Sequence, residues 1–119
     1  MSFELTDDEG EFLIRLARKS ISTLLSKGEK TPVPSNTPEK LLHKCGVFVT
    51  LNTVRDGAEE LRGCIGYPEP ILPLAEATID SAANSATQDP RFPPVSMQEL
   101  ENVIVEISVL TPPEPISVK

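Results

Sequence analysis

The feature that most constrains the fold is the alternation of apolar and polar residues on either side of Asp56-Gly57. Residues 47–52 and 61–66 both alternate with the period of a β-strand, and Asp56-Gly57 is a typical turn dipeptide. A slip of one residue would exchange the two faces of a strand, so the apolar residues select the register. The pattern predicts an antiparallel hairpin with one apolar face made by Val47, Val49, Leu51, Leu61, Gly63 and Ile65. The opposite face is expected to carry Phe48, Thr50, Arg62 and Cys64.

An amphipathic helix is expected before this hairpin. Residues 6–9 have the pattern of a capping box, in which the side chains of Thr6 and Glu9 each accept from the other's backbone N–H. Apolar residues then recur at helical spacing as far as Gly28, which stands where a C-terminal cap belongs. Prolines stiffen the following loop, and a short helix is expected from Thr37 to His43.

A second helix and a third strand are expected after the hairpin. The helix begins near Pro73 with a stripe of small residues, and Asp89 precedes the proline that stops it. Ser96 to Glu99 is a second capping box, and residues 103–110 alternate as a strand. The whole pattern predicts an α+β fold, an antiparallel sheet with flanking helices. At 119 residues the chain fits one domain, spanning residues 1–119.

Composition narrows the class of partner. The formal net charge is -7 and the basic residues are scattered, whereas a nucleic-acid binder needs a concentrated basic footprint. Nucleic acid and an anionic membrane surface are therefore disfavoured. No apolar run approaches the ~20 residues that span a bilayer, and the first residues lack the pattern of a signal peptide. Two cysteines are too few for a secreted disulfide framework, which favours a reducing, cytoplasmic location.

Cys64 is the first candidate for chemistry, as a catalytic thiol. Gly63 and Gly66 flank it at positions where a backbone can approach a ligand closely. Arg62, two residues away, would favour the reactive thiolate if it shares the face of Cys64. The alternative interpretations are that Cys64 is a small packed hydrophobe and that Arg62 makes a structural ion pair.

Other polar residues have similar pairs of interpretations. Glu106 interrupts an apolar strand, either because it lines a site or because its face is solvated. Asp89 and Arg91 flank a proline, and each has a local structural explanation, a cap and an ion pair. His43 is the only histidine, so a Cys–His nucleophile pair would need it, but a surface position explains it better. No zinc spacing joins His43 to the cysteines, so neither a metal nor a cofactor is predicted.

The two cysteines are predicted not to form a disulfide. In the apolar register Cys64 faces the neighbourhood of Phe48, three residues beyond Cys45. That offset is ~10 Å at ~3.4 Å per residue. A disulfide needs Cα atoms within ~7 Å of each other.

The segment Leu61-Arg62-Gly63-Cys64-Ile65-Gly66 resembles the signature hexapeptide of the AMMECR family. Five further segments resemble that family in the same order, so the resemblance covers nearly the whole chain. They are residues 46–51 (GVFVTL), Tyr67-Pro68, the Ala-rich helix, residues 89–94 (DPRFPP) and residues 106–112 (EISVLTP).

The resemblance implies two unequal subdomains with a cleft between them, and hexapeptide side chains that face this cleft. It implies a substrate or ligand site with Cys64 as the catalytic candidate and binding residues Arg62, Gly63, Gly66, Asp89, Arg91 and Glu106. The family has no established activity, and prokaryotic relatives belong to a system that includes a Memo-type and a radical-SAM protein. An enzymatic role in such a modification system is therefore one interpretation. The alternative is a non-catalytic domain whose motif is structural and docks a protein partner.

The length of the chain departs from the family. The family domain continues beyond the Leu-Thr-Pro-Pro segment, whereas this chain ends at Lys119. A C-terminally incomplete domain is expected to leave apolar surface without its usual cover. Such a chain would self-associate, bind a second polypeptide or be marginally stable.

Overall fold

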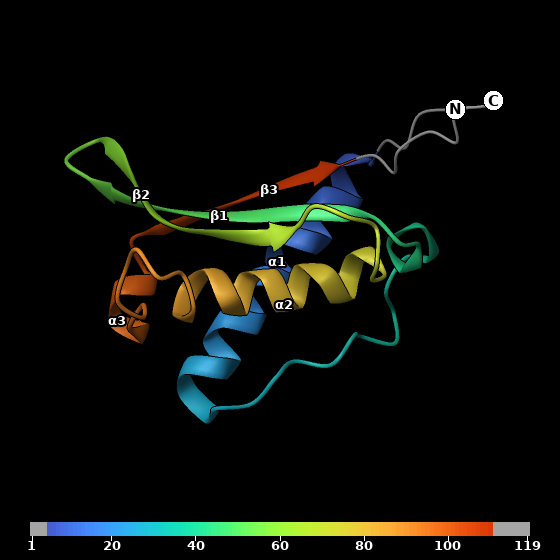
Figure 1. Ribbon diagram of the computed structural model, residues 1–119, viewed down its shortest axis with the longest axis horizontal. Coiled ribbons are helices and arrows are strands. Elements are labelled where there is room, and N and C mark those ends of the chain that lie inside the picture. The colour runs from blue at the N-terminus through green and yellow to red at the C-terminus, as the bar shows by residue number, and fades with distance from the viewer. Residues whose placement is uncertain (1–4, 111–119) are drawn as a thin grey trace.

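The chain folds into two layers, a three-stranded antiparallel sheet and a layer of two long helices packed on one of its faces (Figure 1). A computed structural model describes residues 5–110. The strand order is β2-β1-β3, so the predicted α+β class is confirmed. The elements, in chain order, are α1 (Asp7–Lys27), the 3-10 helix η1 (Glu39–Leu42), β1 (Gly46–Arg55), β2 (Ala58–Tyr67), α2 (Leu74–Thr87), α3 (Met97–Leu100) and β3 (Val103–Leu110).

The turn between β1 and β2 is the one that the sequence predicts. Asp56 and Gly57 both have positive φ, 54° and 79°, and Arg55 pairs with Ala58 across them. Two successive positive φ values define the hairpin turn whose twist matches that of the strands, and Asp-Gly is a preferred pair for it.

The register of the hairpin is partly as predicted. Val49 pairs with Ile65 and Leu51 with Gly63, which keeps these residues on the helix-covered face. A β-bulge then shifts the register, so that Leu61 pairs with Asn52 instead of continuing that face. Leu61 is 43% exposed, and its predicted place in the apolar face is wrong. The physical reason is the extra residue of the bulge, because one inserted residue exchanges the faces that follow it.

Helix α1 has the ends that the sequence predicts. The Thr6 hydroxyl accepts from the Glu9 N–H, the Glu9 carboxylate accepts from the Thr6 N–H, and Gly28 ends the helix with φ 68°. Arg18 was not anticipated as a structural residue. Its guanidinium donates to the carbonyls of Val103 (2.7 Å) and Leu100 (3.0 Å), which ties α1 to the start of β3.

The expected short helix before β1 is a single 3-10 turn that ends at Leu42, one residue earlier than predicted. His43 follows in extended conformation, and its carbonyl accepts from the N–H of Leu74 at the start of α2. The side chain of His43 is exposed.

The core lies between the sheet and the helices. The inward residues of β1 and β3 meet α1 and the small residues of α2, which allow the helix backbone to lie close to the sheet. Ala83, expected in that inward stripe, is only half-buried and lines a cavity between the helices instead. The residues that form one contiguous core cluster are Ala17, Ile21, Val49, Leu51, Ala82, Ala86, Val95, Leu100, Val103 and Val105.

The other face of the sheet, here called the open face, carries the alternate residues of the three strands. No helix of residues 5–110 lies on it (Figure 1). Three cross-strand rows make up its centre: Leu61–Asn52–Ile104, Cys64–Thr50–Glu106 and Gly66–Phe48–Ser108. Within the described part of the chain, no helix is both long and apolar enough to cross a membrane.

Candidate functional site

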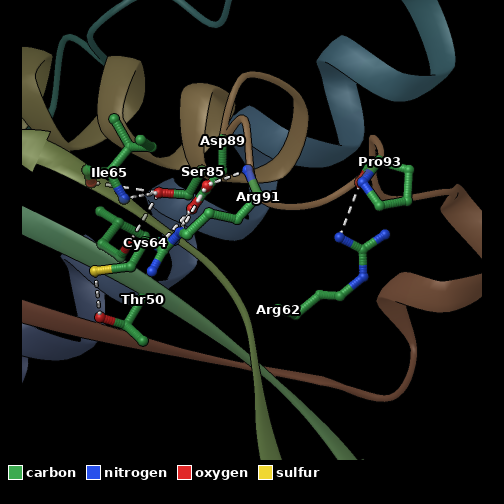
Figure 2. A network of polar contacts seen from close by, with 9 residues as sticks. Thr50, Arg62, Cys64, Ile65, Ser85, Asp89, Arg91 and Pro93 are labelled. Atoms are coloured by element: carbon green, nitrogen blue, oxygen red, sulfur yellow. Dashed lines mark hydrogen bonds and ion pairs between the residues drawn. The ribbon is translucent and has the colours of Figure 1, made fainter.

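The carboxylate of Asp89 joins the end of α2 to the motif strand β2. Asp89 is 4% exposed, and its Oδ2 accepts from the backbone N–H of Cys64 at 3.0 Å (Figure 2). The same carboxylate accepts from the N–H, Nε and Nη2 of Arg91 at 3.0, 3.0 and 2.8 Å. These Arg91 bonds, and then the bond from Cys64, hold the pKa of Asp89 well below its usual range. Asp89 is therefore an ionised anchor for the edge of β2.

Arg91 is the cation beside the thiol. Figure 2 shows its side chain running from the loop after α2 to Cys64. Its hydrogen bonds to Asp89 raise the pKa of Arg91, and the Coulombic effect of Cys64 raises it further. The side chain of Arg91 is 55% exposed, whereas that of Asp89 is 2% exposed. The guanidinium is therefore the solvent-exposed half of this ion pair.

Arg62 points away from Cys64. Its guanidinium makes a paired contact with the carboxylate of Glu99 on α3, with Nη2 to Oε1 at 3.1 Å. Nη1 donates to the carbonyl of Pro93 at 2.9 Å (Figure 2), and the side chain is only 13% exposed. The prediction that Arg62 and Cys64 share a face is wrong, because the bulge turns Arg62 toward the α2–α3 segment. The structural ion pair, which the sequence left open, is what Arg62 makes.

The ring of Phe92 contacts both arginines. Its ring centroid is 5.9 Å from Cζ of Arg62 and 5.4 Å from Cζ of Arg91, within the range of cation–π contacts. The contact with Arg62 links residues 89–94 to the hexapeptide.

At both glycines of the hexapeptide, the space that a Cβ would occupy is taken by other atoms of this chain. A Cβ on Gly63 would lie 2.2 Å from the backbone carbonyl oxygen of Ser85, so α2 approaches β2 directly at this glycine. A Cβ on Gly66 would lie 2.1 Å from the Val47 carbonyl oxygen and 2.7 Å from the ring of Phe48. In each case the close neighbour of the glycine is another part of this chain. A ligand contact at Gly63 or Gly66 stays a prediction.

Ser85 lies where α2 approaches β2 and bonds both β1 and β2. Its hydroxyl accepts from the N–H of Ile65 at 2.9 Å and donates to the carbonyl of Val49 at 2.7 Å (Figure 2). A helix side chain thus sits between β1 and β2 and bonds both strands. Ser85 was missed from the sequence, because a serine in an Ala-rich helix resembles any other small residue.

Cys64 lies on the open face in the middle of one cross-strand row. Its Sγ is 3.3 Å from Oγ1 of Thr50, and Thr50 pairs with Glu106 on its other side. Cys64 is half-buried and Glu106 is exposed. The prediction that Glu106 joins the face of Cys64 is confirmed. The contact of Glu106 is with Asn52, whose Nδ2 lies 3.5 Å from Oε1 of Glu106 and 3.2 Å from Oε1 of Glu59.

Cys45 and Cys64 are both free thiols, as predicted. Cys45 is fully buried and its Sγ donates to the carbonyl of Leu110. Burial raises the pKa of the Cys45 thiol, which makes it an inert, packed side chain. Among residues 5–110 no cluster of three or more His, Cys, Asp or Glu side chains could hold a metal ion.

A cavity of about 460 Å³ lies between α1 and α2, away from the hexapeptide. None of residues 61–66 lines it. Its charged residues are Lys30 and Asp80, which pair at 2.9 Å. The cleft that the family resemblance implies at the motif is a different feature, and it stays a prediction. The cavity is lined by Ser20, Leu24, Lys30, Asp80, Ala83, Asn84, Thr87 and Gln88.

The fold and this motif strand define the class of protein. The AMMECR1 family model matches residues 14–119, and the chain belongs to the AMMECR1 family. It is 54% identical to the protein PH0010 of Pyrococcus horikoshii over 115 residues and 52% identical to the protein MK0488 of Methanopyrus kandleri over 119 residues. The structure resembles the crystal structure of the uncharacterised protein PH0010, with a TM-score of 0.86 at 53% identity over 96% of this chain.

The chain spans little more than half of these relatives. The matches cover 96% and 99% of this chain but 56% of the length of each relative. The structural match covers 57% of the chain in the PH0010 crystal structure.

Proposed function

We propose that the open face around Cys64 is a substrate- or ligand-binding site, one wall of a cleft, in which the thiol acts on a bound molecule. The observation that carries this proposal is the setting of Cys64. Its sulfur is half-buried on a face that no described helix covers, with the guanidinium of Arg91 beside it and Glu106 in the same row. A partly exposed thiol on an uncovered sheet face is accessible to a bound molecule as a nucleophile.

The other residues of the proposed site have supporting and contacting roles. Asp89 holds Cys64 and Arg91 together, and Arg62 holds β2 to α3. Gly63 and Gly66 let α2 and Phe48 pack against the motif strand. In this proposal Cys64, Arg91 and Glu106 meet the ligand directly.

The experiment compares two thiols of the same chain. Purified protein is treated with iodoacetamide, and the modification of each cysteine is followed by peptide mass spectrometry. Cys64 is expected to react faster than a free model thiol such as N-acetylcysteine amide. Cys45, which is 0% exposed, is the internal control and should react only on unfolding. Cys64 that stays unmodified until the protein unfolds would contradict the proposal.

A second function is favoured by a separate observation. Leu61 and Ile104, which flank Asn52 on the open face, are 43% and 42% exposed. Large apolar side chains on an uncovered sheet face are typical of an interaction surface. In that alternative the domain is non-catalytic, the hexapeptide is structural, and the open face docks a protein. An unreactive Cys64, together with shielding of Leu61 and Ile104 by a partner, would favour it.

We also propose a cytoplasmic location and, because the family resemblance implies it, a place in a modification system with a Memo-type and a radical-SAM protein. The two free thiols agree with a reducing compartment. The partners are tested by mixing each purified protein with this chain in analytical ultracentrifugation. A Leu61→Glu variant is the matched control. A complex that forms equally well with the variant would place the contact away from the open face.

A further inference from the structure

The guanidinium of Arg91 has hydrogen-bonding capacity left over beside the thiol. Nε and Nη2 donate to Asp89, whereas Nη1 makes no hydrogen bond within residues 5–110. The carboxylate that pairs with Arg91 is turned inward, since its side chain is 2% exposed and it also accepts from the N–H of Cys64. The exposed half of this ion pair is therefore its positive half.

A fixed guanidinium with free N–H groups is a site for an oxyanion. Arginine presents its donors in a planar fork that matches carboxylate and phosphate oxygens. The two bonds to Asp89 and the ring of Phe92, 5.4 Å from Cζ, hold the fork in one orientation. Little side-chain freedom is lost when such a pre-ordered group binds.

We propose that the ligand acted on at Cys64 carries an anionic group, a carboxylate or a phosphate, which the free edge of Arg91 binds. This inference rests on the proposed function, because it assumes that a ligand reaches the thiol. Asp89 is the positioning residue of this arrangement. Its Oδ2 accepts from the backbone N–H of Cys64 at 3.0 Å and from Nη2 of Arg91 at 2.8 Å, so one oxygen fixes the guanidinium relative to the backbone of Cys64.

The preference of Cys64 for anionic or cationic reagents distinguishes a local cation at the thiol from the negative charge of the whole chain. The chain has a formal net charge of -7, which by itself attracts cations to every surface thiol. Only a cation held close to Cys64 reverses that preference. Charged thiol reagents report the difference directly.

The test uses three methanethiosulfonates of similar size: anionic, cationic and neutral. In each, the thiolate attacks the reagent sulfur, a mixed disulfide forms and methanesulfinate leaves. The anionic-to-cationic rate ratio at Cys64 is expected to be higher in the native protein than in the denatured chain and to fall with added salt. Arg91→Gln should lower the native ratio by about tenfold to thirtyfold, because Coulomb's law in a water-like dielectric gives a factor of about five for each reagent charge ~4 Å away, and the two reagents are affected in opposite directions.

Two variants serve as controls for the loss of one positive charge. Arg55→Gln removes an exposed charge at the tip of the β1–β2 hairpin, where Arg55 pairs with Ala58. Arg15→Gln removes an exposed charge on α1. Both should leave the ratio near that of the wild type. The wild-type comparison of native and denatured protein needs no variant, so it holds even if Arg91→Gln fails to fold.

Each outcome bears on a different step. A Cys64 that is slow toward all three reagents would overturn the proposed function itself. Fast reaction with the neutral reagent, without an anionic preference, would leave that proposal standing and overturn the anion site. A preference that persists in Arg91→Gln would remove Arg91 as the recognising group. Inorganic phosphate and acetate, added separately as competitors against the neutral reagent, distinguish the two anion classes by which one protects Cys64.

Discussion

The contact between Gly63 and α2 gives the sharpest test of this fold. In Gly63→Ala the new Cβ would lie 2.2 Å from the carbonyl oxygen of Ser85 and 3.1 Å from its carbonyl carbon. Both neighbours are helix backbone, so α2 has to move away from β2. Overpacking of this kind costs about 1–3 kcal/mol. The movement also stretches the two hydrogen bonds of Ser85, to Ile65 and Val49, at about 1 kcal/mol each.

The expected loss of unfolding free energy in Gly63→Ala is therefore about 2–5 kcal/mol. Urea denaturation followed by far-UV circular dichroism measures it, since the chain has no tryptophan to report by fluorescence. Gly10→Ala is the matched control, because a Cβ on Gly10 meets no atom within 4 Å. That change lies inside α1 and should stabilise the protein by up to about 1 kcal/mol.

A double-mutant cycle isolates the role of Ser85. Ser85→Ala alone leaves a buried N–H and a buried carbonyl without their partner and should cost about 1–3 kcal/mol. In the Gly63→Ala background the same change should cost less than about 1 kcal/mol, because the bonds are already broken. A Gly63→Ala protein within about 0.5 kcal/mol of the wild type would refute the reasoning.

Four further results are expected. Arg62→Ala should lower the unfolding free energy in urea by about 1–3 kcal/mol, because its guanidinium holds a carboxylate and two carbonyls. Hydrogen bonding to Arg62 lowers the pKa of Glu99. The stability that this carboxylate contributes is therefore present above its ordinary pKa of 4.5 and is lost as the pH falls through the folded-state pKa. Acid unfolding of Glu99→Gln should lack that loss of stability. Cys64→Val should cost less than about 2 kcal/mol in thermal unfolding, since the side chain is half-buried; a larger loss would indicate tight core packing instead. Sedimentation over a range of concentrations should show self-association through the open face, reduced in a Leu61→Glu/Ile104→Glu variant; a strict monomer would contradict this.

Features with a local cause could be predicted from the sequence. The capping boxes at Thr6 and Ser96, the cap at Gly28 and the Asp56-Gly57 turn each depend on a few neighbouring residues, and all are present in the structure. The alternation of apolar residues also gave the pairing of β1 with β2 as far as Gly63. Periodicity succeeds here because successive side chains of a regular strand point alternately to the core and to solvent.

Only the tertiary structure decided which arginine lies beside the thiol. The sequence placed Arg62 with Cys64 because residues two apart share a face of a regular strand. The bulge at Arg62, just before Gly63, breaks that rule, and Arg62 turns to Glu99, 37 residues further along the chain. Arg91 takes the place beside Cys64 through Asp89, which is 25 residues from the cysteine that it binds. Contacts between residues so far apart leave no periodic trace in the sequence, so the chemistry around Cys64 emerges only where α2 and its following loop meet the strand.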